Sequence, residues 1–223
     1  IYNYRTDRYE QPATDFPTDV RTMALQGDTL WIGALNGLYT YQLQNRKLSP
    51  LDTKRNGLPH NTIYSIIRTG DNQIYVGTYN GLCRYIASNE KFEKIPLPVN
   101  SSQSNLFVNS LLEDTGRQCI WIGTEGYLFQ YFPSTGQMKQ TEAFHNNSIK
   151  SLALDGNGDL LAGTDNGLYV YHNDVTPLQH IIHDSRNIQS LTNNIIWNIF
   201  ADQEHNIWLG TDYGISLSRY NSA

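Results

Sequence analysis

The chain has 223 residues, enough for one or two domains with a sizeable core. Its 16 Lys and Arg against 21 Asp and Glu give a formal net charge of -5, so electrostatics gives no reason to expect nucleic acid or an anionic membrane as a partner. No run approaches the roughly 18 apolar residues of a membrane span, and we find no signal peptide, so we expect any export or anchoring segment outside these residues. The two cysteines, Cys83 and Cys119, lack zinc spacing, and free thiols are favoured over a bridge.

One pattern recurs five times along the chain. Each copy has an apolar or aromatic run, a glycine, a turn and a second apolar run. The copies occupy 30–41, 74–85, 120–131, 160–171 and 207–218. Their first glycines lie 44, 46, 40 and 47 residues apart, at Gly33, Gly77, Gly123, Gly163 and Gly210. This spacing is typical of propeller blades and of some helical arrays, so the local pattern must distinguish them.

The local pattern favours strands. Turns of the Asn-Gly or Asp-Tyr-Gly kind divide the copies, which predicts hairpins whose turns need a residue with positive φ. A fourth strand follows the hairpin, as at 91–95 and 137–140. Another apolar run precedes each hairpin, at 20–23, 63–66, 108–111, 149–152 and 196–199. Each repeat is therefore predicted to be an antiparallel sheet of four strands, a to d in chain order.

Such repeats predict an all-β fold, a single β-propeller of about five four-stranded blades over 1–223. The Trp or Tyr of strand b should pack between neighbouring blades, because one blade cannot bury both of its faces. Residues 1–11 match strands c and d, so we expect them to be the outer strands of a preceding blade. A closed five-bladed ring is the alternative, but the duplicated strand c favours a fragment of a larger ring. We expect the blades at approximately 12–55, 56–100, 101–142, 143–187 and 188–220.

The blade pattern resembles the two-component regulator propeller repeat. The matching residues are Asn-x-Ile-x-x-Ile-x-x-Asp followed by Ile-Trp-Leu-Gly-Thr-Asp-x-Gly, complete from Asn194 to Gly214. The resemblance implies a seven-bladed propeller in the periplasmic sensor of a hybrid histidine kinase of Bacteroidetes. It also implies oligosaccharide ligands and control of genes for carbohydrate use, with kinase activity elsewhere in the parent protein. Five blades where the family uses seven is the main departure, and it too indicates a fragment.

Motifs for metal or cofactor chemistry are weak. His180 and His183 are three apart on an expected strand, so they point to opposite faces, and surface or loop histidines are favoured over a metal site. Residues 155–159 match the start of a calcium loop, but Leu160 and Asn166 stand where that loop requires Gly and Glu. We find no nucleophile elbow, zinc-protease motif or P-loop. We therefore predict no cofactor and no metal.

A ligand site is predicted from positions that vary among the repeats. Positions that serve the fold repeat, whereas a site shared by several blades must vary to fit one asymmetric ligand. The second residue of strand a is Arg21, Tyr64, Asn109, Lys150 or Trp197. The matching position of the b–c turn is Leu35, Tyr79, Glu125, Asp165 or Asp212. Both sets should lie on one face near the channel; free drift of exposed positions and ordinary turn chemistry are the alternatives.

We interpret the chain as a ligand-sensing module and not an enzyme. Its expected partners are an oligosaccharide, the neighbouring domains of the parent receptor and, in the parent, a second copy, with neither nucleic acid nor direct membrane insertion. The expected location is the periplasm. An enzymatic alternative is a propeller hydrolase or lyase that uses Glu125, Asp165 and Asp212 as acid–base groups. A scaffold that binds another protein on its rim is a third hypothesis.

Overall fold

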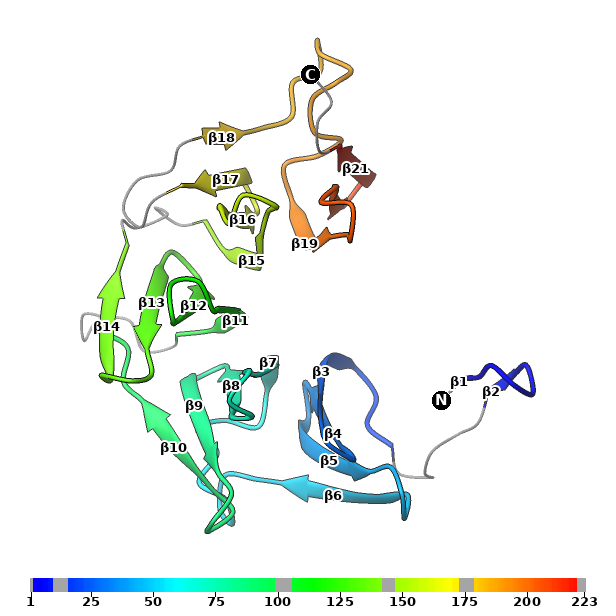
Figure 1. The fold of residues 1–223 in the computed structure, drawn as a ribbon, viewed down its shortest axis with the longest axis vertical. Coiled ribbons are helices and arrows are strands. Elements are labelled where there is room, and N and C mark those ends of the chain that lie inside the picture. Colours follow the sequence, from blue (N-terminus) through cyan, green and yellow to red (C-terminus); the bar gives the residue numbers. More distant parts are fainter. Residues whose placement is uncertain (1, 10–15, 99–105, 142–146, 173–178, 220–223) are drawn as a thin grey trace. The chain divides into compact units, whose positions relative to one another are not determined.

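The computed structural model describes residues 2–9, 16–98, 106–141, 147–172 and 179–219 (Figure 1). The chain forms two compact units, 1–96 and 97–223. Within every sheet, neighbouring strands are consecutive in the chain, and the paired strands are antiparallel. In the described part of the chain, no helix could cross a membrane. The predicted all-β class is confirmed.

The first unit contains two four-stranded sheets, with β7 packed against β3 and β4. Trp31 of strand b is 2% exposed and lies in one cluster with Ile66 and Ile74 of the next sheet, as predicted. Its ring meets that of Tyr85 edge-on, with centroids 4.8 Å apart. The strands are β3 (Val20–Gln26), β4 (Thr29–Ala34), β5 (Gly37–Gln42), β6 (Lys47–Leu51), β7 (Ile63–Arg68), β8 (Ile74–Thr78), β9 (Gly81–Ile86) and β10 (Lys91–Ile95).

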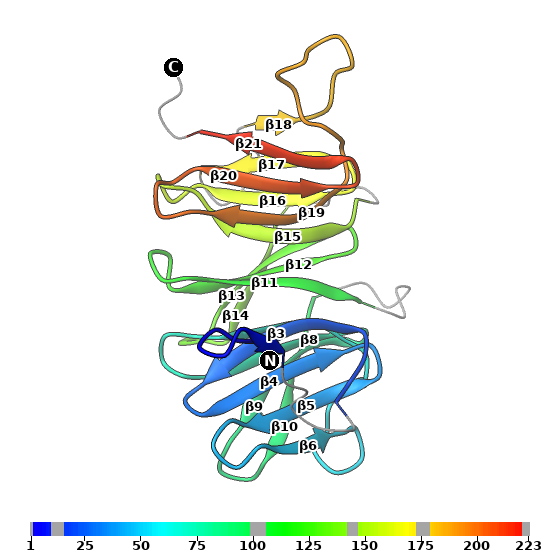
Figure 2. The ribbon, with the colours of Figure 1, turned by 90° about the vertical axis from the view of Figure 1, so that its right-hand side faces the viewer.

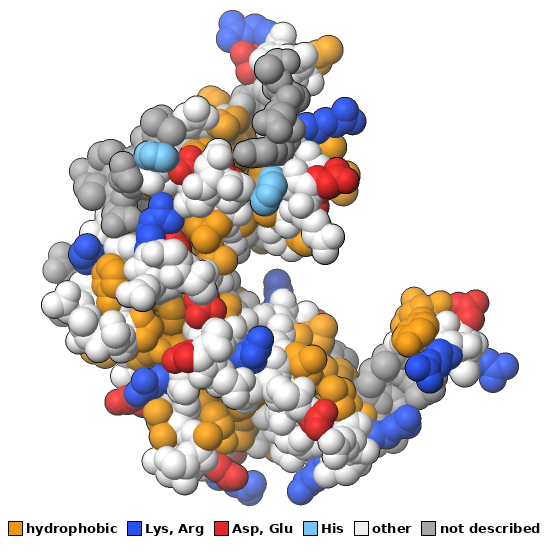
Figure 3. Space-filling view, viewed as in Figure 1, with side chains coloured by type: hydrophobic (Ala, Val, Ile, Leu, Met, Phe, Trp, Pro, Cys, Tyr) orange, Lys and Arg blue, Asp and Glu red, His pale blue; other side chains and the backbone are white. Residues whose placement is uncertain are grey.

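A short hairpin precedes these sheets. Its strands are β1 (Tyr2–Asn3) and β2 (Arg8–Tyr9). The rings of Tyr2 and Tyr9 lie 5.1 Å apart, and Tyr4 and Tyr9 are largely exposed, which gives the hairpin the hydrophobic surface seen in Figure 3. A two-stranded sheet is marginally stable by itself. Ile1 and the rest of the predicted strand d lie outside the described residues, and the assignment of 1–11 to a preceding blade stays a prediction.

The second unit contains two four-stranded sheets and a sheet of three described strands. The sheets β15–β18 and β19–β21 overlap in Figure 2, and β19 packs against β15 and β16. In turn, β15 packs against β11 and β12. Trp121 of strand b is 1% exposed in one cluster with Leu160 and Tyr171 of the next sheet. The strands are β11 (Val108–Asp114), β12 (Cys119–Thr124), β13 (Leu128–Phe132), β14 (Gln137–Gln140), β15 (Ile149–Leu154), β16 (Leu160–Thr164), β17 (Gly167–Tyr171), β18 (Gln179–Ile181), β19 (Ile196–Ala201), β20 (Ile207–Thr211) and β21 (Gly214–Ser218).

The b–c turns follow the predicted chemistry with one exception. Gly81, Gly167 and Gly214 have φ of 97°, 95° and 114°, the left-handed region that favours glycine. Gly37 lies outside that region. A Cβ at Gly37 would come within 3.0 Å of the Tyr39 ring, which would have to shift by a few tenths of an ångström to admit it.

Both cysteines are buried free thiols, and each takes part in a hydrogen bond within its own sheet. Cys83 donates to the carbonyl of Val76, with Sγ and O 3.6 Å apart. The Gln130 side-chain amide donates to Cys119 Sγ at 3.4 Å. Burial raises the pKa of the Cys83 thiol.

Candidate functional site

In all five sheets, a β-bulge lies at the second residue of strand a. In β3, for example, Val20 pairs with Ala34 and Thr22 with Gly33, which leaves Arg21 unpaired. A bulge redirects its side chain away from the regular alternation of the strand. The five residues in this position, which we call the bulge residues, are Arg21, Tyr64, Asn109, Lys150 and Trp197. They are the same five strand-a residues that the sequence predicts as ligand-site candidates.

Packing between adjacent sheets positions the start of the bulge. In β7, β15 and β19, the isoleucine before the bulge residue lies over the first glycine of the preceding sheet's hairpin. A Cβ on Gly33 would be 2.6 Å from Ile63 Cγ2, and one on Gly123 would be 2.5 Å from Ile149 Cγ2. Because no side chain fits there, the repeated glycine and isoleucine hold strand a at a fixed depth against its neighbour.

In the first unit, hydrogen bonds between two sheets surround the turn candidate Tyr79. The amide of Tyr79 in a b–c turn donates to Thr62 O at 3.1 Å, and Thr62 Oγ1 donates to Leu35 O in the turn of the preceding sheet at 3.1 Å. The Tyr79 ring lies 4.8 Å from that of His60. Thus the segment that leads into β7 contacts two b–c turns, that of its own sheet and that of the preceding sheet. On β3, the bulge residue Arg21 is exposed.

In the second unit, the candidates on two sheets meet at Ser148, directly before β15. Asn109 Nδ2 donates to Ser148 Oγ at 3.0 Å, and the Ser148 amide donates to Asp165 Oδ1 at 3.1 Å. Glu125 forms an isolated antiparallel bridge with Ser148, and its side chain is exposed. Ser148 thus contacts Asn109 through its hydroxyl, Asp165 through its backbone amide and Glu125 through a backbone bridge.

Three further candidates meet on the next pair of sheets. The Lys150 ammonium lies over the Trp197 ring, 4.5 Å from its centroid. The Trp197 indole N–H donates to Asp212 Oδ1. Lys150 and Trp197 are both bulge residues, and Asp212 is in the b–c turn between β20 and β21. The structure thus brings together cationic, aromatic and anionic groups from two blades.

Sequence reasoning missed Ser148 and His60, which contact the candidate residues. A weak signal exists for Ser148. A residue with a hydroxyl group directly precedes strand a in two repeats, Thr62 and Ser148, and in both its hydroxyl contacts the preceding sheet. Nothing in the repeat pattern points to His60, because its stacking on Tyr79 depends on how the d–a segment turns.

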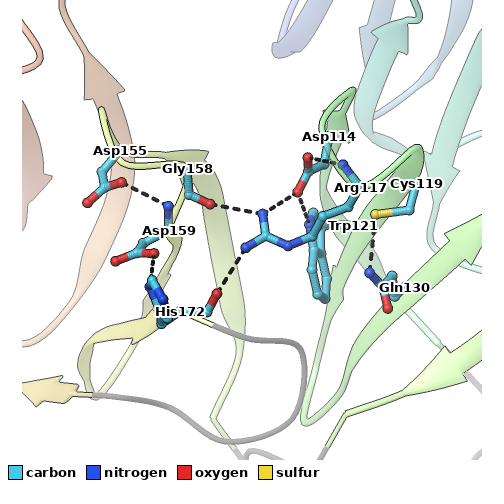
Figure 4. Close-up of polar contacts among 9 residues, drawn as sticks. All are labelled: Asp114, Arg117, Cys119, Trp121, Gln130, Asp155, Gly158, Asp159 and His172. Carbon is cyan, nitrogen blue, oxygen red and sulfur yellow. Dashed lines mark hydrogen bonds and ion pairs between the residues drawn. The ribbon is translucent and has the colours of Figure 1, made fainter.

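The opposite end of β11 is occupied by a polar network that joins two blades (Figure 4). Arg117 forms an ion pair with Asp114 at 2.7 Å, and its guanidinium also donates to Gly158 O and His172 O of the next sheet at 2.9 and 3.1 Å. The Trp121 indole donates to Asp114 Oδ2 at 3.0 Å. Burial raises the pKa of Asp114, but the hydrogen bonds from Trp121 and Arg117 outweigh it and hold that pKa below its usual value.

The weaker motifs take part in local structure. Asp155 Oδ1 accepts hydrogen bonds from the amides of Asn157 and Asp159 at 2.8 and 2.9 Å, so it closes the hairpin turn. His180 stacks on Tyr169 with ring centroids 4.0 Å apart. His183 Nδ1 lies 2.5 Å from Leu191 O. In the residues that the structure describes, no group of three potential metal ligands occurs.

Comparison with known proteins identifies the repeat. The family model described as the two-component regulator propeller matches residues 57–80 and 190–213. The chain carries two-component regulator propeller repeats. The second match covers the end of the loop before β19, the bulge residue Trp197 and the turn residue Asp212, so it includes two of the candidate positions of the second unit.

Two crystal structures resemble the chain closely. Both are of the extracellular domain of BT4673 from B. thetaiotaomicron, described in one case as a proposed one-component system and in the other as a proposed hybrid two-component system. They are 91% and 92% identical to the chain, with TM-scores of 0.95, and cover 99% and 100% of it. The chain spans 30% of the length of each.

Two more distant proteins are also similar to the chain. A histidine kinase P4 of Formosa agariphila is 27% identical over 250 residues, which cover 99% of this chain and 17% of that protein. The WD40 β-propeller domain of Doa1 is 15% identical, with a TM-score of 0.67 over 91% of this chain and 64% of that one. The latter likeness concerns the fold alone, and it agrees with the predicted propeller blades.

Proposed function

We propose that this chain is a ligand-binding part of the extracytoplasmic sensor of a hybrid two-component histidine kinase. The observation that carries this proposal is its 91% and 92% identity to extracellular domains of signalling systems. The proposal places the chain in the periplasm and its kinase activity in other domains. Neighbouring domains of the receptor, and a second receptor copy, would receive the signal.

The bulge residues and the b–c turn residues of the second unit are proposed as the ligand site. Their backbone positions repeat in every sheet, whereas their side chains do not, which suits recognition of one asymmetric ligand. Sugars present an apolar ring face together with many hydroxyl groups. An exposed indole and a set of amide, hydroxyl and carboxylate groups complement those two features. We therefore propose an oligosaccharide as the ligand.

A binding assay tests this proposal. The chain is applied to an array of plant and host oligosaccharides, and any binding is measured by calorimetry for the chain and two variants. We expect Trp197→Ala to weaken binding more than tenfold, about 1.4 kcal/mol or more. Phe200→Ala is the matched control, because Phe200 is also an exposed aromatic residue of β19 and is not a bulge residue. Equal effects of the two changes, or no binding to any glycan, would contradict the proposal.

The same samples test the enzymatic alternative. Asp165 accepts a hydrogen bond from the Ser148 amide, and Asp212 accepts one from the Trp197 indole. These bonds favour a structural role for the two carboxylates over acid–base catalysis. We expect no release of reducing ends from a bound oligosaccharide. Turnover that Glu125→Gln, Asp165→Asn or Asp212→Asn abolishes would instead establish a propeller hydrolase or lyase.

A further inference from the structure

Trp197 is an exposed ring held in a defined orientation. It is 54% exposed, whereas Trp31 and Trp121 are 2% and 1% exposed. Its indole N–H donates to Asp212, and its backbone is the bulge of β19. A large aromatic surface in water costs free energy that burial would recover, so a ring fixed in this position is suited to being covered by something else.

In this structure, the group that lies over the Trp197 ring is Lys150 of the neighbouring blade. Lys150 Nζ lies 4.5 Å from the centroid of the Trp197 ring. Among the described residues, Lys150 forms no ion pair with a carboxylate that would hold its ammonium elsewhere. An exposed cation–π contact is weak, and the four-carbon stem of lysine is flexible. Another group can therefore displace the ammonium at small cost.

We infer that Lys150 is a displaceable cover of the Trp197 ring, and that a sugar ring must replace its ammonium in order to stack there. This inference rests on the proposed function and specifies the ligand further. The b–c turns of the same unit carry three carboxylates, Glu125, Asp165 and Asp212, against the single Lys150. A polyanionic saccharide would be repelled by this set, so the ligand is an uncharged oligosaccharide.

The test compares Lys150→Ala with a matched control. Alanine removes both the ammonium and its stem, so the side chain at position 150 can no longer cover the ring. Lys139→Ala is the control, because the Lys139 ammonium also lies over an aromatic ring, that of Phe132 at 5.1 Å, on the outer strands of another blade. The probes are cellotetraose, xylotetraose, mannotetraose and galactotetraose, with tetragalacturonate as the acidic counterpart, and binding is measured by calorimetry.

Lys150→Ala should tighten binding of the uncharged oligosaccharide about two- to fivefold, the factor that an exposed cation–π contact is worth. Lys139→Ala should leave that affinity unchanged. Weaker or unchanged binding in Lys150→Ala would overturn the inference while leaving the proposed function in place. Preference for tetragalacturonate would overturn it as well.

A second readout needs no ligand, so it separates failure of the inference from failure of the proposed function. Acrylamide quenching of Trp197 is taken as the difference between each protein and its Trp197→Phe variant. We expect the quenching constant to rise in Lys150→Ala and to stay the same in Lys139→Ala. An unchanged constant in Lys150→Ala would show that the lysine side chain does not cover the ring, whether or not any glycan binds.

Discussion

Ile196 lies directly over Gly163 of the preceding sheet. A Cβ on residue 163 would be 2.7 Å from Ile196 Cγ2 and 2.5 Å from Ser151 Oγ, closer than real side chains approach. Ile196 immediately precedes the bulge residue Trp197, and Gly163 pairs with Ser151, which follows the bulge residue Lys150. The contact that packs these two blades together therefore also positions Lys150 and Trp197.

Gly163→Ala should destabilise the chain by about 1–3 kcal/mol, the usual cost of forcing an extra methyl group into a filled core. The control is Gly210→Ala in the equivalent position of the last sheet, where a Cβ would meet nothing closer than 3.9 Å. That variant should change stability by no more than about 0.5 kcal/mol. Urea unfolding followed by fluorescence measures both, and equal losses would contradict the packing argument.

Arg117 should contribute more to stability than an exposed arginine in an ion pair. Arg117→Met leaves Asp114 buried without its partner and removes two hydrogen bonds to the next blade, so we expect a loss of about 2–4 kcal/mol. Arg186→Met is the control, since Arg186 pairs with Asp184 but is 89% exposed. It should cost about 0–1 kcal/mol. Similar losses from the two changes would mean that the network of Figure 4 does not join the blades energetically.

Acid should destabilise the fold partly through Asp114. Because its folded pKa lies below that of the unfolded chain, about 3.9, the folded state binds fewer protons. This stability is fully present above the unfolded pKa and is lost as the pH falls through the folded pKa. The free energy of unfolding of Asp114→Asn should therefore fall less steeply below pH ~4. An unchanged slope would assign the acid sensitivity to other carboxylates.

The thiols should be unreactive until the chain unfolds. Both cysteines are buried, and burial raises the pKa of Cys83, so little reactive thiolate forms at neutral pH. A thiol reagent such as DTNB should modify no cysteine in the native chain and both of them in denaturant without reductant. Rapid modification of the native chain would contradict the burial, and a missing signal in denaturant would indicate a disulfide.

Asp212→Asn should affect ligand binding more than folding. Asparagine can still accept the Trp197 indole hydrogen bond, but it removes the charge that strengthens it. We expect the affinity for an oligosaccharide to fall about three- to thirtyfold, the range for weakening one hydrogen bond to a charged group. The urea midpoint should remain unchanged because Asp212 is exposed. A shifted midpoint with unchanged affinity would make Asp212 a turn residue only.

The sequence by itself determined the repeat and the order of the strands within each sheet. Strand periodicity, turn glycines and repeat spacing are local properties, so they can be read without a structure. The Asn-Gly turns at Gly81 and Gly167 place their glycines at positive φ, and the buried Trp31 and Trp121 of strand b have apolar neighbours. The Asn36-Gly37 turn is an exception to this local rule, because Gly37 lies outside the positive-φ region.

Only the tertiary structure decided which of the variable residues meet. Lys150 and Trp197 are 47 positions apart, and their contact depends on a bulge in each strand and on the depth at which Ile196 packs over Gly163. Ser148 joins Asn109 and Asp165 for the same reason. Contacts between blades are set by packing across two sheets, and no single repeat contains the information that places one against the next.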